Sequence, residues 1–163
     1  MSSPALICLD GSELALQAAV AGLEVLRPDA ALKLVAVIAE PDPTLVTGGG
    51  FTGSTMSAEA FDAQNAAAKA DAEEMLAAAQ QSLGLESVEH QVLIGSPGPT
   101  VCAYAEEIGA TVIVIGSRGH GGLRRAFLGS VSDHIIRHAH CPVLVSGHDA
   151  VEGGGASALA VAV

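Results

Sequence analysis

Short apolar runs alternate along the chain with longer segments in which apolar residues recur at helical spacing. Each run is rich in Val, Ile, Leu or Ala and is bounded by glycine, proline or polar residues, which predicts a buried strand. The five predicted strands cover residues 5–10, 32–39, 88–94, 111–115 and 142–146.

The four intervening segments predict helices. Ser12 and Ser57 are placed to cap the first two, while Pro28 and Gly84 are placed to end them. Pro97 suits the first turn of the third helix. The predicted helices cover about residues 12–28, 57–83, 97–109 and 130–139.

The order of these elements, βαβαβαβαβ, predicts one α/β domain over residues 1–147. Such alternation produces a doubly wound, five-stranded parallel sheet with helices on both faces. The Gly- and Thr-rich residues 44–56 are interpreted as a loop. Residues 148–163 are interpreted as a flexible tail, although the last six are apolar and could pair with another segment.

Composition limits the classes of function. A net charge of −11 does not provide the broad basic surface that a duplex-binding protein needs. We therefore predict no nucleic-acid partner. No run of about 18 apolar residues is present, so we predict no membrane span either. The three cysteines form no CxxC pair, Cys8 and Cys102 are expected in the core, and no basic segment precedes the first strand. These features predict a cytoplasmic protein.

The segment most informative about function follows the fourth predicted strand. Residues 112–132 read VIVIGSRGHGGLRRAFLGSVS, which is an apolar run, a glycine-rich loop and the start of a helix. Glycines let main-chain N–H groups approach a ligand closely, and a helix N-terminus favours an anion. Four of the seven basic residues lie between Gly116 and His140: Arg118, Arg124, Arg125 and Arg137. This local positive charge predicts a phosphate ligand, although Arg124 and Arg125 fit a solvated face equally well.

Strand order indicates which other residues lie near this loop. A doubly wound sheet binds ligands beyond the carboxyl ends of its strands, where the strand order reverses. If strands two and three lie on one side of strand one, and strands four and five on the other, that crevice lies between strands one and four. Asp10 ends the first strand and Gly116 the fourth. A carboxylate there would repel phosphate but could accept hydrogen bonds from ribose, which points to a nucleotide.

The glycine loop also carries a resemblance to a known family. Gly116 and Gly119, followed after nine residues by Gly129-Ser130, have the spacing G-x2-G-x9-G-[S/T]. With this spacing the chain resembles the nucleotide-binding universal stress proteins, as it does in LICLDGSE (6–13), VAVIAE (35–40) and HAHCPVLVS (138–146). The resemblance covers about residues 4–146. It implies a Rossmann-like fold of strand order 3-2-1-4-5, bound ATP without a P-loop lysine, and a homodimer paired through the last strand, residues 142–146.

The resemblance also implies roles for individual residues. Asp10 would hold the ribose and Val37 would line the adenine pocket. The phosphate cradle would consist of Gly116, Arg118, Gly119, Gly129, Ser130, Val131 and Ser132. A Mg²⁺ ion accompanying ATP would bridge the phosphates, and neither a catalytic residue nor a protein metal ligand is assigned. Cys8 and Ala36 depart from the family, which often has a branched apolar residue or proline at the first position and a histidine at the second.

Two other nucleotide-binding motifs do not account for this chain. Gly48-x-Gly50-x-x-Gly53 matches the dinucleotide pattern, but that fingerprint joins the first strand tightly to its helix. Here it lies well beyond the second predicted strand, so we interpret it as a loop that could fold over a bound nucleotide. A P-loop requires a lysine in GxxxxGK[ST], and neither Lys33 nor Lys69 lies in such a motif.

The last predicted helix and the residues after it also contain side chains of the kinds found in metal sites and catalytic triads. Its potential metal ligands are His134, His138, His140 and Cys141. His134 and His138 share a helix face, but polar side chains near a helix end also bind its last carbonyl groups, so no metal is predicted. Ser130, Asp133 and His134 do not predict a catalytic triad, because consecutive helical positions point about 100° apart.

These observations and the resemblance predict a universal stress protein. Its expected function is to bind ATP and to act as a nucleotide-dependent switch or adaptor in the stress response. Phosphates would draw the 117–129 loop, and with it loop 41–56, into one conformation that an unidentified signalling partner reads. The alternative is a slow adenine-nucleotide hydrolase, for which His120 is the candidate base in the loop. A nucleotide-free dimerisation module is a third interpretation, which the intact glycine motif disfavours.

Overall fold

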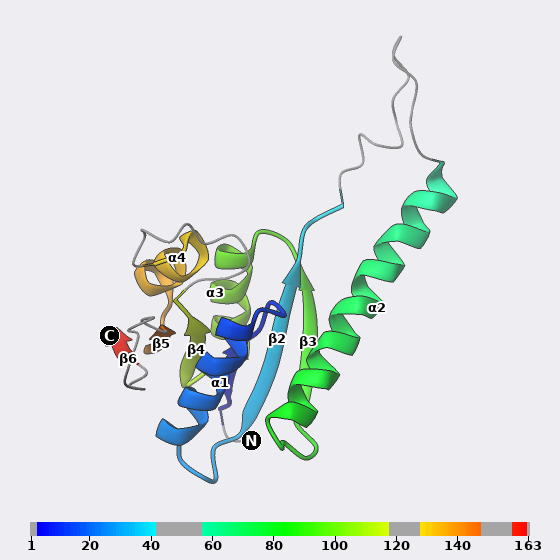
Figure 1. The fold of residues 1–163 in the computed structure, drawn as a ribbon. Coiled ribbons are helices and arrows are strands. Elements are labelled where there is room, and N and C mark those ends of the chain that lie inside the picture. The colour runs from blue at the N-terminus through cyan, green and yellow to red at the C-terminus, as the bar shows by residue number, and fades with distance from the viewer. Residues whose placement is uncertain (1–2, 42–56, 118–127, 148–157, 163) are drawn as a thin grey trace, which may run out of the picture.

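Six strands form one sheet in the order β3-β2-β1-β4-β5-β6 (Figure 1). The computed structural model describes residues 3–41, 57–117, 128–147 and 158–162. The first five strands pair in parallel, whereas β6 pairs antiparallel to β5. The strands are β1 (Ala5–Cys8), β2 (Leu32–Ile38), β3 (Glu89–Ile94), β4 (Val112–Gly116), β5 (Val143–Gly147) and β6 (Ala158–Ala162). The predicted order 3-2-1-4-5 of the parallel strands is therefore confirmed.

Helices cover both faces of the sheet, as predicted. The helices are α1 (Glu13–Val25), α2 (Ala58–Ser82), α3 (Pro97–Glu107) and α4 (Ser130–His138). Buried residues of α3 and α4 share a core cluster on one face, and buried residues of α1 and α2 share a second cluster on the other. Figure 1 also shows the N-terminal part of α2 running past the ends of β2 and β3.

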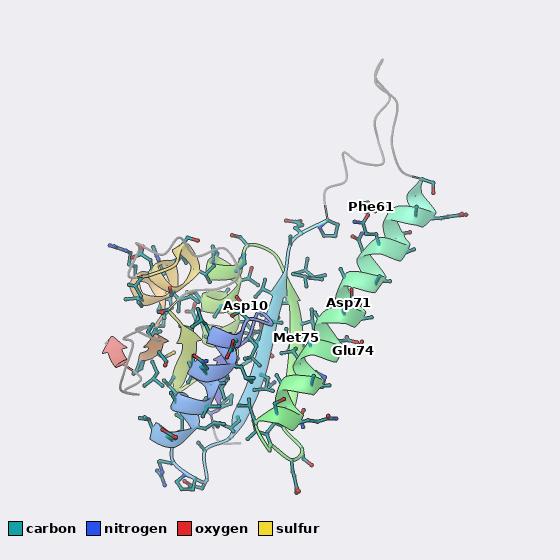
Figure 2. All side chains as sticks on the ribbon, in the orientation of Figure 1. Asp10, Phe61, Asp71, Glu74 and Met75 are labelled. Atoms are coloured by element: carbon teal, nitrogen blue, oxygen red, sulfur yellow. The ribbon has the colours of Figure 1, made fainter. Side chains whose placement is uncertain are left out.

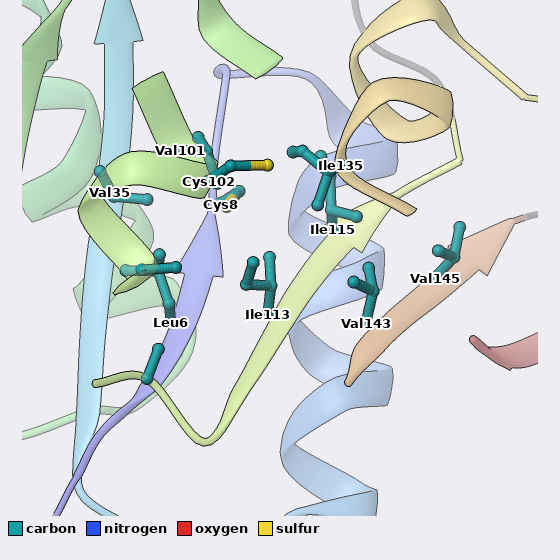
Figure 3. Close-up of a cluster of buried hydrophobic side chains, with 12 residues drawn as sticks. Leu6, Cys8, Val35, Val101, Cys102, Ile113, Ile115, Ile135, Val143 and Val145 are labelled. Carbon is teal, nitrogen blue, oxygen red and sulfur yellow. The ribbon is translucent and has the colours of Figure 1, made fainter. Parts of the chain in front are cut away.

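Side chains of each central strand alternate between the two clusters. In β1, Leu6 and Cys8 face α3 and α4, whereas Ile7 faces α1 and α2. Figure 3 shows the first of these clusters, in which Cys102 of α3 and Ile135 of α4 lie over the strands. This two-sided burial explains why the central strands read as continuous apolar runs rather than as alternating ones.

The predicted helix caps are confirmed. Ser12 Oγ accepts a hydrogen bond of 3.1 Å from Ala15 N, and Ser57 Oγ accepts one of 3.2 Å from Ala60 N. These side chains satisfy N–H groups that have no partner within the helix. Gly84 directly follows Leu83, the C-cap residue of α2. Its φ of +65° suits its predicted role of ending the helix.

The end of the chain differs from the sequence-based expectation. Residues 158–162 form strand β6, although residues 148–163 were expected to be a flexible tail. Consequently β5 is not the last strand, and its outer edge is occupied by the same chain instead of being open for the predicted dimer. An open strand edge exposes unpaired N–H and C=O groups that any extended segment within reach can satisfy. Composition alone does not reveal such a pairing.

No helix in the described part of the chain is long and apolar enough to cross a membrane.

Candidate functional site

The candidate site lies at the carboxyl ends of β1 and β4, which are neighbours in the sheet. From β1, the chain winds through β2 and β3 on one side and through β4 and β5 on the other, so the strand order reverses between β1 and β4. Ile7 pairs with Val114 in the parallel register. Asp10 and Ser117 each lie three residues further along, so the two strands deliver them to the same edge. The structure therefore brings together the two segments that the sequence predicted would meet.

Asp10 is held at the start of α1 (Figure 2). Its Oδ1 atom accepts hydrogen bonds from Ser12 N at 2.9 Å and from Ser12 Oγ at 2.6 Å. The Ser12 hydroxyl in turn accepts from Ala15 N, so carboxylate, cap and helix form one connected group. Asp10 is exposed, and this group fixes the position of its carboxylate at the rim of the sheet.

The exit from β4 is tied to both β5 and α4 by main-chain hydrogen bonds. Ser117 N donates to Ser146 O of β5 at 2.8 Å, and Gly129 N donates to Ser117 O at 2.7 Å. The residues on either side of the glycine-rich loop are thus joined directly. Gly116 is buried at the end of β4. Arg118, Gly119 and the rest of 118–127 lie outside the described residues.

Ser132 closes the base of the same loop. Its side chain is 2% exposed, and its hydroxyl lies 2.9 Å from Ser117 O and 3.0 Å from Gly129 O, where it donates. The resemblance placed Ser132 in the phosphate cradle without assigning its side chain a direction. In the structure its hydroxyl faces inward and holds the two ends of the loop together. The sequence signal for this role is a serine three residues after Gly129, which is the spacing of a side chain that bonds back within the first turn.

The first turn of α4 supplies the groups that an anion would use. Gly129 is the N-cap, and the first helical bond runs from Asp133 N to Gly129 O. The N–H groups of the three residues before Asp133 consequently have no acceptor within the helix, which is the arrangement that favours anions. Ser130 is exposed, whereas Val131 packs against the core cluster beneath α3 and α4. An anion at this turn would therefore meet backbone N–H groups more than side chains.

Val37 lies on the side of the sheet that α3 and α4 cover. It pairs with Leu93 of β3 and is half-buried against the same core cluster as Val131. Val37 stands near the carboxyl end of β2, next to the strand that leads to Asp10. An apolar surface is thus present at the same edge as the carboxylate and the α4 N-terminus.

Arg137, one of the arginines that predicted a local positive charge, forms an ion pair within α4. Arg137 Nε donates to Asp133 Oδ1 and Oδ2 at 3.1 and 3.0 Å. This bond holds the pKa of the Asp133 carboxyl below its ordinary value. Arg137 is therefore engaged near the end of α4, away from the helix N-terminus, and Asp133 is bound to Arg137 rather than oriented toward His134 for a triad.

The geometry supports neither a metal site at the histidines of α4 nor a reactive thiol in the core. The rings of His134 and His138 stack with centroids 4.2 Å apart and planes 19° from parallel, so their lone pairs do not converge on one point. No group of three potential ligands suited to a metal occurs among the described residues. Burial raises the pKa of the Cys8 and Cys102 thiols, which disfavours the reactive thiolate.

Comparison with known proteins places this arrangement among relatives. The sequence profile of the universal stress protein family matches residues 1–146. Universal stress protein YxiE of Bacillus subtilis is 30% identical over 149 residues, which cover 89% of this chain and 99% of that protein. Universal stress protein Slr1101 of Synechocystis is 40% identical over 67 residues, 40% of this chain. The matched regions span only part of the first curated relatives, 62% of Slr1101 and 34% of universal stress protein MJ0531 of Methanocaldococcus jannaschii.

Solved structures share the fold at lower identity. Hypothetical protein MJ0577 superposes with a TM-score of 0.72 at 23% identity, covering 93% of this chain and 99% of that one. A universal stress protein in complex with cAMP gives 0.53 at 22% identity, with 88% and 94% covered. A family member from Arabidopsis thaliana with AMP bound gives 0.55 at 16% identity, with 91% and 94% covered. At these identities the similarity shows the fold.

Proposed function

Because the chain belongs to the universal stress protein family, we propose that it binds an adenine nucleotide, ATP, at the carboxyl edge between β1 and β4. In this proposal the bound nucleotide sets the conformation of the glycine-rich loop, and a signalling partner in the stress response reads that conformation. The setting is the cytoplasm, in keeping with three cysteines that are all free.

One observation carries the proposal: the two ends of the glycine-rich loop are joined directly in front of the α4 N-terminus. Ser117, Gly129 and Ser132 make this junction through hydrogen bonds of 2.7 to 3.0 Å. A loop whose ends are held this way starts and finishes beside helix N–H groups that favour phosphate oxygens. Phosphates would lie there, with Gly119 and Arg118 of the loop completing the cradle.

The remaining parts of a nucleotide have matching surfaces at the same edge. The Asp10 carboxylate would accept hydrogen bonds from ribose hydroxyls, and Val37 would pack against the adenine ring. The cAMP and AMP complexes of proteins with this fold support an adenine nucleotide as the ligand class. Mg²⁺ bound with ATP would neutralise phosphate charge. Asp10, after β1, and Glu40, after β2, are described acidic residues at these strand ends.

A holding role fits the charge arrangement better than rapid hydrolysis does. Lys33 lies near the start of β2, at the amino ends of the parallel strands and away from the candidate site. There its Nζ forms a 2.9 Å ion pair with Glu89. Lys69 lies on α2 beside Glu73 at 3.9 Å. Neither lysine is placed to stabilise charge on a transferring phosphoryl group. Binding that orders a loop, with a partner reading the result, requires no such group.

The direct test combines native purification with calorimetry. Mass spectrometry of the gently purified protein identifies any nucleotide that accompanies it, and titration of the emptied protein with ATP, AMP and cAMP ranks their affinities. Gly119→Leu should weaken ATP binding at least about tenfold, or about 1.4 kcal/mol, because the added side chain keeps the backbone away from phosphate. Its circular dichroism and melting temperature should stay those of the wild type. Unchanged affinity in a folded variant would refute the cradle.

Turnover separates this proposal from the hydrolase alternative. Wild-type protein incubated with excess ATP and Mg²⁺ should release no more than about one phosphate per protein over the time of a binding experiment. Multiple turnovers that His120→Ala abolishes would instead support the enzyme.

A further inference from the structure

Strand β6 covers the outer edge of β5 along its whole length. The antiparallel register pairs Val143 with Ala162 and Gly147 with Ala158, so every residue of each strand has a partner in the other. Among the described elements, β5 is the one with which β6 makes extensive contact. The position of β6 therefore depends on this one ladder.

The edge beneath β6 is well suited to self-association. Val143, Leu144 and Val145 are each at most 4% exposed, so β5 is an ordered, apolar strand that is fixed in the core. On its inner side it pairs with β4. Without β6, its outer N–H and C=O groups would form an open template for another strand. Two copies related by a two-fold axis would present this same edge to each other in antiparallel orientation.

The composition of β6 makes it a weak cover. It reads ALAVA, three alanines among five residues, and residues 148–157 separate it from β5. Because hydrophobic stabilisation scales with the apolar area buried, alanine side chains contribute little to holding a strand in place. Its hydrogen bonds to β5 could be replaced, one for one, by those of a second β5 strand.

We propose that β6 is an intramolecular competitor of self-association. When β6 pairs with β5 of its own chain, the edge is closed and the chain is monomeric. When β6 leaves, β5 pairs antiparallel with β5 of a second copy and a dimer forms. This inference is independent of nucleotide binding, since it rests on the sheet edge alone.

The first test weakens β6. Sedimentation velocity over a range of protein concentrations measures the association constant of the wild type and of Ala160→Pro, whose φ is fixed at about −65° rather than at the extended value of an antiparallel strand. We expect the variant to associate at least about tenfold more tightly, because β6 competes less. Ala160→Val, which keeps a strand-forming residue at the same position, should associate no more tightly than the wild type. Identical association of the wild type and a folded Ala160→Pro would overturn the proposal.

The second test locks β6 in place. Because it replaces the buried Val145, the reduced form of the same double variant is the matched control for the oxidised form. Val145 and Ala160 are Cα partners, so cysteines at both positions can form a disulfide across the antiparallel pair. After oxidation with oxidised glutathione, peptide mapping should find the bridge within one chain, and the locked protein should remain monomeric at every concentration. A dimer that persists with the intrachain bridge would overturn the proposal. So would a bridge between two chains, which would indicate that β6 is exchanged between copies.

Discussion

At Gly22 the backbone of α1 lies directly against β4. A Cβ atom at this position would come 2.6 Å from Val114 Cγ1 and 3.1 Å from Val114 Cγ2. Val114 is completely buried and β-branched, so its side chain has little freedom to move aside. Glycine at this position is what allows α1 to approach the centre of the sheet.

Gly22→Ala should therefore destabilise the protein by about 1–3 kcal/mol through overpacking. Urea denaturation followed by circular dichroism measures the change. The Gly22→Ala/Val114→Ala double variant is the control, because the second substitution makes room for the new methyl group. Its cost should be smaller than the sum of the two single costs. Simple additivity would show that the contact between residues 22 and 114 is not the cause.

Ser132 illustrates how much one inward-facing hydroxyl contributes to the candidate site. Ser132→Ala removes the donor to Ser117 O and Gly129 O, and we expect a loss of about 1 kcal/mol, since Ser117 O keeps its bond from Gly129 N. ATP affinity should fall as well, because the ends of the loop are less firmly joined. Ser130→Ala, on the exposed side of the same turn, should change stability by no more than about 0.5 kcal/mol. Equal effects of the two substitutions on stability would contradict the inward role.

At the scale of single elements, the two edges of the sheet are protected in different ways. Strand β6 covers β5, whereas the β3 edge carries polar side chains at Glu89, His90 and Gln91. Charged and polar residues on an edge strand discourage pairing with another molecule. Glu89 also links β3 to β2. It is the Cα partner of Lys33, and its carboxylate forms a 2.9 Å ion pair with Lys33 Nζ.

This link predicts a pH dependence. The hydrogen bond from Lys33 lowers the pKa of Glu89 below its ordinary value of 4.5 and raises the pKa of Lys33 above 10.5. The carboxylate therefore contributes stability above pH 4.5 that is lost as pH falls through its folded pKa. The lysine contributes stability below pH 10.5 that is lost as pH rises through its own folded pKa. Between these limits the pair is intact.

Glu89→Gln tests the acidic limit. Urea midpoints of the wild type and the variant should differ at pH 7 and converge as the pH is lowered through the folded pKa of Glu89, which lies below its ordinary value of 4.5. Glu86→Gln removes the same charge three residues away and should leave the midpoint at pH 7 closer to that of the wild type. A difference between wild type and Glu89→Gln that persists at low pH would argue against the pair.

At the scale of the whole molecule, the fold brings the residues proposed to bind the nucleotide to the carboxyl ends of the parallel strands. Parallel strands all end on the same side, so Asp10, Val37 and Gly116 reach that edge from three different strands. The two core clusters hold those strands rigidly from both faces. The proposed control of self-association lies at a different place, the outer side of β5, where the association experiments described above apply.

Much of the architecture was readable from local sequence. Apolar runs predicted the five parallel strands, helical spacing predicted the four helices, and Ser12 and Ser57 were correctly placed as caps. These features depend on neighbouring residues, whose side-chain periodicity and hydrogen-bonding capacity act within a few positions. The proximity of Asp10 to the end of β4 followed from topology alone.

Three features were decided by tertiary structure. The pairing of β6 with β5, the inward hydroxyl of Ser132 and the engagement of Asp133 by Arg137 were not predicted. Each depends on which partner a group meets once the chain has folded. A sequence contains many groups that could pair with a given serine, arginine or apolar strand, and it does not single out one of them. The sequence by itself therefore determined the family, the parallel sheet and the location of the candidate site. Only the tertiary structure decided which partner each of these groups takes, because strand edges and polar side chains bind whatever complementary group packing brings within hydrogen-bonding distance.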